Sequence, residues 1–203
     1  MLIGPFVMDP NLLQRAFEFA SVAHRGQVRK GQPVPFIAHL MGVSSLVLDH
    51  GGDAEEASAA LLHDTLEDTS TTADDLEKEF GKRVTAIVVA CTDNLQPCPD
   101  DWRDRKERFI LCIRDTDPSA RLVIASDKLH NARDVVRCQR ETGDEAFRPF
   151  VGGKVGTVWY YRAALEQLET SNDSRLTALL HDLRHEVEEM ERLASHQSQD
   201  AKA

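Results

Sequence analysis

Residues 59–69 of the chain combine side chains that suit metal-assisted hydrolysis. Four apolar residues, 59–62, lead directly into His63, Asp64, Glu67 and Asp68. An adjacent histidine and aspartate can place an imidazole nitrogen and a carboxylate oxygen on one cation. If the helix continues, Glu67 lies one turn from His63, and Asp68 one turn from Asp64. A metal lowers the pKa of bound water and a nearby carboxylate exchanges its proton, so this run predicts hydrolytic chemistry.

The alternative for this run is that its acidic residues simply end the helix. Acidic side chains at a helix C-terminus interact unfavourably with the helix dipole. That alternative therefore predicts a small loss of helix stability that no function would explain. The functional interpretation is therefore the stronger one.

Two other segments supply residues of matching type. His39 opens an expected helix among apolar neighbours, where a single histidine is commonly a satisfied core residue. Asp127 follows the five largely apolar residues 122–126. A carboxylate is costly to bury there unless it is paired or bound to a metal. Asn131 comes one helical turn later on the same face, where it can orient a ligand or contact a substrate.

Helices must position these side chains, because the apolar residues recur at helical spacing along the chain. Asp53 is an expected N-cap, and Asp117 followed by Pro118 is another start signal. Residues 25–35 form a loop rich in glycine, proline and positive charge. The expected helices cover residues 10–23, 36–49, 54–66, 73–80, 84–90, 101–114, 118–137, 157–168 and 175–193.

The fold class expected is all-α, with one domain over residues 1–195 and a disordered polar tail over 196–203. Acidic residues (34) exceed basic ones (24), which gives a formal net charge of −10. Such a chain is a poor general binder of nucleic acid or of anionic membranes. An anionic substrate therefore requires a metal ion or a local basic cluster.

Cysteine spacing and hydropathy indicate the cellular compartment in which the protein works. The four cysteines lack a C-x2-C pair, which disfavours a structural zinc site and favours reduced core thiols. The sequence contains neither a membrane-length apolar run nor a secretory signal pattern. We expect a cytoplasmic location.

The ordered motifs resemble a known family. His39, then His63-Asp64, then Asp127 is similar to the signature of HD-domain metal-dependent phosphohydrolases. The wider set over residues 16–137 resembles the hydrolase domain of RelA/SpoT-type alarmone enzymes, and the length resembles the small alarmone hydrolases. Within this span, the first motif is the Ala-His-x-x-Gln-x-Arg-Lys run at residues 23–30, and the last is the Asp-Lys-Leu-His-Asn-x-Arg run at 127–133.

The resemblance implies a helical HD-domain bundle of about eight to ten helices. It implies hydrolysis of the 3′-pyrophosphate of (p)ppGpp, which yields GDP or GTP and pyrophosphate. Glu67 and Asp68 match the pair that positions or activates water. A bound Mn²⁺, for which other divalent metals can substitute, is implied at His39, His63, Asp64 and Asp127.

The resemblance also implies substrate contacts. Arg29 and Lys30 match a pair near the nucleotide, and Asn131 and Arg133 match the substrate-side Asn-x-Arg. Residues 152–162 lack the P-loop pattern, and Trp159 and Tyr160 there are expected core anchors. Lys154 and Tyr161 are additional substrate candidates. His24 and His130 are expected to be structural.

Several positions depart from the family pattern and leave the nucleotide open. None removes a metal ligand. The alternatives are an adenine alarmone, another 2′- or 3′-phosphorylated nucleotide such as NADPH, or a catalytically silent metal- or nucleotide-binding regulator. The Glu67-Asp68 pair argues against the last. The oligomeric state is not predicted. The departures are Phe36, Leu40, Lys128, Asp134 and the run Cys91-Thr92-Asp93.

Overall fold

The computed structural model describes residues 10–93 and 101–200, which fold into helices joined by short connections. This confirms the expected all-α class. Every helix in these two ranges is too short or too polar to cross a membrane. The elements are α1 (Pro10–Ala23), α2 (Ile37–Asp49), α3 (Ala54–Leu62), α4 (Thr65–Asp68), α5 (Ala73–Cys91), α6 (Trp102–Ile113), α7 (Pro118–Thr142), the 3-10 helix η1 (Gly143–Phe147), α8 (Gly153–Leu168) and α9 (Leu176–Asp200).

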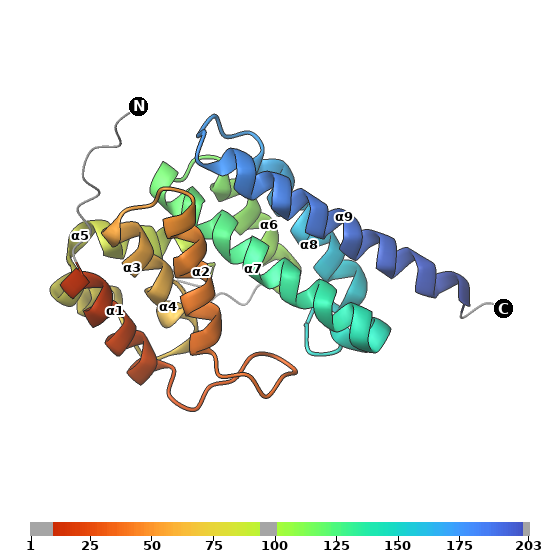
Figure 1. Cartoon of the computed structure of the whole chain (residues 1–203), viewed down its shortest axis with the longest axis horizontal. Helices are drawn as coiled ribbons and strands as arrows, with labels where there is room; N and C mark the ends of the chain where they lie inside the picture. The colour runs from red at the N-terminus through yellow and green to blue at the C-terminus, as the bar shows by residue number, and fades with distance from the viewer. Residues whose placement is uncertain (1–9, 94–100, 201–203) are drawn as a thin grey trace.

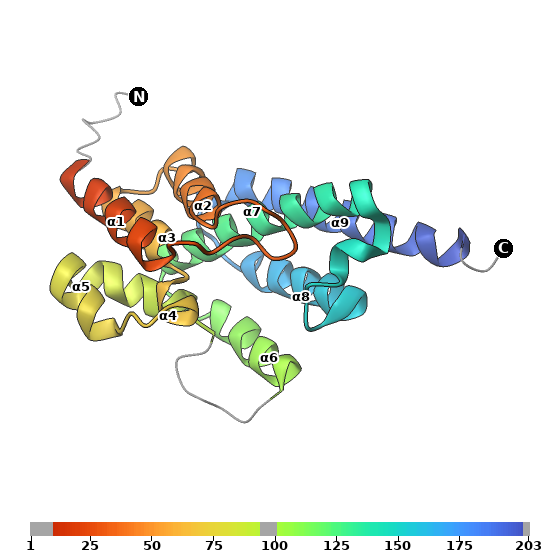
Figure 2. The same cartoon turned by 90° about the horizontal axis from the view of Figure 1, so that it is seen from below.

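Helix α7 runs through the middle of the molecule (Figure 1). It begins as the sequence predicts, because the Asp117 side chain accepts the backbone N–H of Ser119 at 2.8 Å and Pro118 occupies the first turn. Helix α9 lies along one side of α7, and α2, α3, α5 and α8 pack against its other sides (Figures 1 and 2). A residue in the middle of α7 can therefore meet residues from several other helices.

Helix α3 is almost entirely buried, and its N-terminus is fixed by a capping box. Asp53 Oδ1 accepts the backbone N–H groups of Glu55 and Glu56 at 3.0 and 2.9 Å. Glu56 returns the interaction by accepting the Asp53 N–H at 2.8 Å. Eight of the nine residues of α3 are buried. The helix thus holds its C-terminal end, and His63 beyond it, in a fixed place in the core.

The helix expected over residues 54–66 is broken at His63 and Asp64. His63 Nδ1 donates to the Ala60 carbonyl at 2.7 Å, and Thr65 Oγ1 donates to the Leu62 carbonyl at 2.6 Å. These side chains occupy carbonyl groups that a continuing helix would pair with backbone N–H groups. His63 and Asp64 keep right-handed helical backbone angles across the break, and the chain resumes as α4.

The helices expected over 73–80 and 84–90 are confirmed: both lie within α5, and Gly81, with a φ of +83°, interrupts the helical backbone between them. The end of α9 differs from the prediction. Helix α9 continues to Asp200, so the tail expected to be disordered from residue 196 is helical as far as residue 200. The physical reason is that glycine and proline are absent from α9, so nothing stops the helix at 195. Residues 1–9 of the expected domain and 201–203 of the expected tail lie outside the described residues.

Candidate active site

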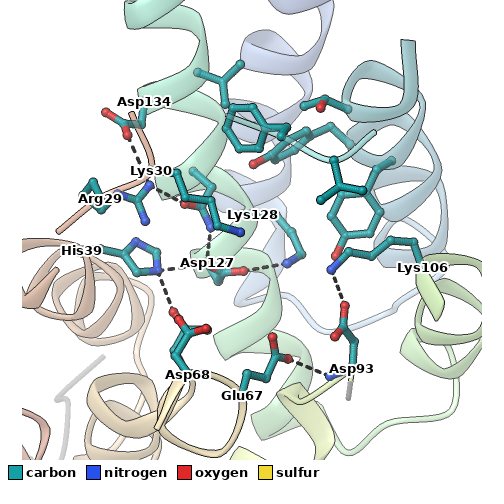
Figure 3. Close-up of a pocket in the computed structure, with 18 of the residues that line it drawn as sticks. Arg29, Lys30, His39, Glu67, Asp68, Asp93, Lys106, Asp127, Lys128 and Asp134 are labelled. Carbon is teal, nitrogen blue, oxygen red and sulfur yellow. Dashed lines mark hydrogen bonds and ion pairs between the residues drawn. The ribbon is translucent and has the colours of Figure 1, made fainter. Parts of the chain in front are cut away.

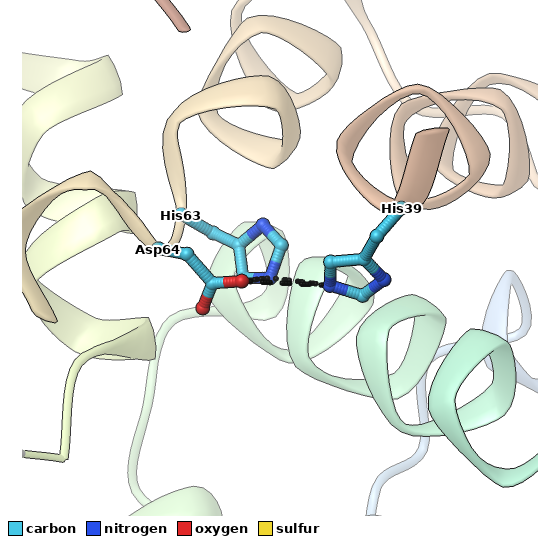
Figure 4. Close-up of side chains that lie close together, drawn as sticks. All are labelled: His39, His63 and Asp64. Carbon is cyan, nitrogen blue, oxygen red and sulfur yellow. Dashed lines mark hydrogen bonds and ion pairs between the residues drawn. The ribbon is translucent and has the colours of Figure 1, made fainter. Parts of the chain in front are cut away.

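Three segments that are distant in sequence meet at the candidate metal ligands. His39 lies in the first turn of α2, His63 and Asp64 lie in the break before α4, and Asp127 lies in the middle of α7. His39 Nε2 is 3.3 Å from His63 Nε2 and 3.5 Å from Asp64 Oδ2 (Figure 4). Asp127 Oδ1 is 3.2 Å from His39 Nε2 and 3.5 Å from His63 Nε2. His39, His63 and Asp64 each bring one donor atom close enough together to hold a divalent metal, and Asp127 Oδ1 lies beside both imidazoles.

The two imidazoles are held so that Nε2 faces the centre. His63 Nδ1 is occupied by the Ala60 carbonyl at 2.7 Å, and His39 Nδ1 lies 3.0 Å from His130 Nδ1. A partner on Nδ1 fixes the tautomer and leaves the Nε2 lone pair for a metal. His130, expected to be only structural, thus contacts a candidate ligand. The spacing of three residues between Asp127 and His130 places both on the same side of α7.

The charges around this centre favour a cation. Burial acts to raise the pKa of Asp127, but Lys128 and the two imidazoles hold it well below its usual range. Burial opposes a charge on His63, but Asp64 and Asp127 raise the pKa of its imidazole well above the usual value. The carboxylates therefore stabilise positive charge between them, and a divalent ion supplies such a charge.

Glu67 and Asp68 project from α4 into the same cavity (Figure 3). Glu67 Oε1 accepts the backbone N–H of Asp93 at 2.7 Å. Burial, with the charges of Asp93 and Asp64, raises the pKa of Glu67 to about 7. Burial and the charge of Asp64 also raise the pKa of Asp68. A carboxyl group that titrates near neutral pH can both accept and return a proton.

A short chain of side chains positions Asp68. His24 Nδ1 donates to Gln27 Oε1 at 2.7 Å, and Gln27 Nε2 donates to Asp68 Oδ2 at 3.2 Å. His24 is buried and stacks on Phe36, with 5.0 Å between ring centroids. The structure thus gives His24 the packing role that the sequence predicts and adds a link to the candidate catalytic residue.

The site opens into a cavity of about 380 Å³, walled by the loop after α1 and by α2, α4, α6, α7 and α8. Arg29, Lys30, Asn131 and Tyr161, four of the expected substrate contacts, line it. Arg29 Nη2 donates to Asn131 Oδ1 at 2.6 Å, and Asn131 Nδ2 donates to Asp127 Oδ1 at 2.5 Å. The loop that carries Arg29 is therefore connected to a candidate metal ligand.

Two expected substrate contacts lie elsewhere. Arg133 donates to Asp182 of α9 at 2.8 Å, because a step of two residues from Asn131 turns about 200° around α7. Lys154 donates to Asp144 at 2.8 Å and to the Ala194 carbonyl at 3.0 Å. Neither residue lines the cavity. The structure corrects the expectation for both.

Sequence reasoning missed the basic side of the cavity. Lys106 of α6 forms an ion pair with Asp93, and Lys128 Nζ lies 2.6 Å from Asp127 Oδ2. Burial acts to lower the pKa of Lys128, but Asp127, with smaller contributions from Tyr160 and Tyr161, raises it well above its usual value. The adjacency of Lys128 to Asp127 was the available signal for one lysine. For Lys106, α6 carries no comparable motif.

Tyr160 also lies in the cavity wall, and Trp159 interacts with a charge from α6. Tyr160, expected as a core anchor, is buried and lines the cavity. The Arg103 guanidinium lies 3.1 Å from the centroid of the Trp159 ring. These aromatic residues join α6 to α8.

Comparison with known proteins agrees with this geometry. The HD domain family model matches residues 16–158. The guanosine-3′,5′-bis(diphosphate) 3′-pyrophosphohydrolase MESH1 of Xenopus tropicalis is 38% identical over 141 residues, which are 68% of this chain and 76% of that protein. The Homo sapiens protein of the same name is 39% identical over 136 residues, 66% of this chain and 74% of that one.

Solved structures of other proteins superpose on this chain over most of its length. A structure described as a metazoan ortholog of SpoT that hydrolyses ppGpp superposes with a TM-score of 0.70 and 25% identity, covering 87% of this chain and 96% of that chain. The protein lmo0812 of Listeria monocytogenes EGD-e superposes with a TM-score of 0.67 and 27% identity, covering 73% of this chain and 96% of that chain.

Proposed function

The chain belongs to the HD domain family, and from that premise we propose that it hydrolyses the 3′-pyrophosphate of the guanosine alarmones (p)ppGpp. The products are GDP or GTP and pyrophosphate. The observation that carries this proposal is the convergence of two imidazoles and two carboxylates beside Glu67 and Asp68, at the wall of a cavity with basic side chains.

His39, His63, Asp64 and Asp127 would hold the metal. When bound, a divalent ion polarises a phosphoryl oxygen and lowers the pKa of water. Mn²⁺ is our proposal for this ion. The mixed nitrogen and oxygen donors suit it, and they also accept neighbouring divalent metals.

Glu67 and Asp68 would position the attacking water and transfer its proton. Glu67 Oε1 is engaged by the Asp93 N–H, which leaves Oε2 to take a proton from the attacking water. A pKa of about 7 lets this carboxylate release the proton again at neutral pH. Asp68, held by Gln27, orients the water.

Basic and polar groups of the cavity would hold the nucleotide. Arg29 and Lys30 face the phosphates, since both line the cavity near the candidate ligands. Asn131 fixes Arg29 at 2.6 Å and so keeps its guanidinium in place for an anion. We further infer a cytoplasmic location, where such a nucleotide occurs, and no role for nucleic acid or membranes as partners.

The experiment is nucleotide turnover by the purified protein with Mn²⁺, with products resolved by ion exchange. ppGpp, pppApp and NADPH are compared side by side, with and without EDTA. GDP and pyrophosphate from ppGpp, abolished by EDTA, support the proposal. Turnover of only pppApp or NADPH contradicts the guanosine assignment, and stoichiometric binding without turnover contradicts the enzymatic one.

A further inference from the structure

Two lysines from different helices converge beside the candidate metal ligands. Lys106 of α6 and Lys128 of α7 point toward each other across the cavity (Figure 3). Their ammonium nitrogens lie 4.9 and 5.2 Å from the centroid of the same Tyr160 ring. Both side chains also line a smaller recess of about 50 Å³, which His63, Asp64 and Asp127 border. The recess therefore joins the lysines to the candidate metal centre.

These two charges are mostly shielded from water. The Lys106 and Lys128 side chains are 20% and 12% exposed. Like charges placed together in a shielded site repel one another, so the arrangement is unfavourable unless anions offset it. Asp93 offsets one charge and Asp127 the other.

Each ammonium keeps donors for a further anion. An ammonium has three N–H donors, and each lysine gives one hydrogen bond to its carboxylate. Among the described residues, these are the acceptors within hydrogen-bond distance of the two ammonium groups. The free donors of the two ammonium groups can therefore receive a group bound next to the metal ligands.

The size of the recess limits what that group can be. A water needs roughly 10–15 Å³ of such space, so a recess of about 50 Å³ accommodates three to five small atoms. A nucleoside is far too large for it, whereas one phosphoryl group fits.

We propose that Lys106 and Lys128 bind the distal phosphoryl group of the leaving 3′-pyrophosphate. This inference rests on the proposed function. In the reaction, the water oxygen bonds to the proximal phosphorus, the bond from that phosphorus to the ribose 3′-oxygen breaks, and the 3′-oxygen takes a proton. Both phosphoryl groups leave together as pyrophosphate. The lysines therefore select a 3′-pyrophosphate over a 3′-monophosphate.

The test compares two substrates of the Mn²⁺-loaded protein, ppGpp and guanosine 5′-diphosphate 3′-monophosphate. We expect Lys106→Met to raise KM for ppGpp by about 10-fold or more, since one charged hydrogen bond to phosphate is lost. Turnover of the 3′-monophosphate should fall several-fold less than turnover of ppGpp, so that the preference for ppGpp drops. Inorganic pyrophosphate should inhibit the variant about 10-fold less strongly, with inhibition by inorganic phosphate unchanged.

Matched variants separate the direct effect from indirect ones. Lys82→Met, at an exposed lysine of α5, should leave all these constants unchanged. Lys106→Arg should restore much of the preference, because it keeps the charge. The double variant Asp93→Asn/Lys106→Met removes the pair together, so a persisting defect excludes an effect of an unpaired Asp93. Melting curves establish that each variant is folded.

Equal losses for both substrates in Lys106→Met, or no loss for either, would overturn the inference while leaving the hydrolase assignment intact. Recovery of normal ppGpp kinetics in the double variant would also overturn it. If wild type fails to hydrolyse ppGpp, the proposed function fails. In that case, pyrophosphate binding that is weakened by Lys106→Met still supports the lysine subsite, and binding unaffected by the substitution overturns it.

Discussion

Glu67 is the residue at which burial and like charge act together on one carboxyl group. Its pKa rises to about 7 because the side chain is buried and because Asp93 and Asp64 lie nearby. The Asp93 N–H and Lys106 oppose this shift without cancelling it. A general base tuned in this way is expected of a hydrolase that works near neutral pH.

This shift predicts a pH-dependent stability for the metal-free protein. Between the ordinary pKa of 4.5 and the folded value of about 7, the folded protein keeps a proton that the unfolded chain has released. Wild type should therefore lose stability relative to Glu67→Gln as pH rises through this window. The difference should be near zero below the window and on the order of 3 kcal/mol above it. Urea unfolding of both proteins at about pH 5 and about pH 8 measures it. An equal difference at both pH values contradicts the raised pKa.

The residue types of the site could be predicted from sequence better than their contacts. His63 and Asp64 stand out because polar groups follow an apolar helix abruptly, and Asp127 because a buried carboxylate needs a partner. Their convergence depends on three helices meeting, which no local pattern specifies. Lys106 was missed for the same reason, since its partner Asp93 lies on a different element.

At the scale of elements, α2 and α7 approach closely at one glycine. A Cβ built on Gly42 would lie 2.3 Å from the His130 ring. Glycine inside a helix costs about 1 kcal/mol relative to alanine, so its presence at this position fits a steric need. The space lets His130 reach His39.

Gly42→Ala should therefore behave unlike an ordinary helix substitution. We expect a loss of about 1–3 kcal/mol of stability, because the new methyl group overlaps the His130 ring. Mn²⁺ affinity should fall as well, because His39 loses the partner that orients it. Thermal unfolding and Mn²⁺ titration measure the two effects. Ser45→Ala, at an exposed position of α2, should change neither. A Gly42→Ala protein more stable than wild type would show that the helices can separate without cost.

Helix starts could be predicted from sequence, whereas the break at His63 could not. Asp53 and Asp117 cap α3 and α7 as expected, since capping uses side chains close in sequence. The break depends on which carbonyl groups accept hydrogen bonds from the side chains of His63 and Thr65, and tertiary packing determines those pairs. Helix α9 extends beyond the expected end because its polar composition is compatible with a helix as well as with a tail.

At the scale of the molecule, an ion pair connects the start of α9 to the capped start of α3. Arg175 Nη1 lies 2.9 Å from Glu56 Oε1, and the Glu56 side chain is only 3% exposed. The same Glu56 carboxylate closes the capping box of α3. The packing of α9 thus supports the helix that presents His63 and Asp64.

Arg175→Met should lower the free energy of unfolding by about 1–3 kcal/mol, because it removes the cation that is hydrogen-bonded to a buried carboxylate and leaves Arg83, 3.8 Å away, as the charged partner of Glu56. Arg184→Met is the control. It removes an exposed pair with Glu169 and should cost about 0.5 kcal/mol or less. Urea denaturation of the wild type and the two variants measures the loss of stability caused by each substitution. Equal losses in both variants would mean that Glu56 does not depend on Arg175.

The most direct test of the central claim is Mn²⁺ content together with ppGpp turnover in two variants of the candidate site. We predict that Asp64→Ala loses bound metal and activity together, because it removes a ligand. Glu67→Gln should keep metal near the wild-type level and lose turnover by at least about 100-fold, as expected for removal of a general base. Wild-type metal content in both variants would contradict the division between metal ligands and proton-transfer residues on which the proposed mechanism depends.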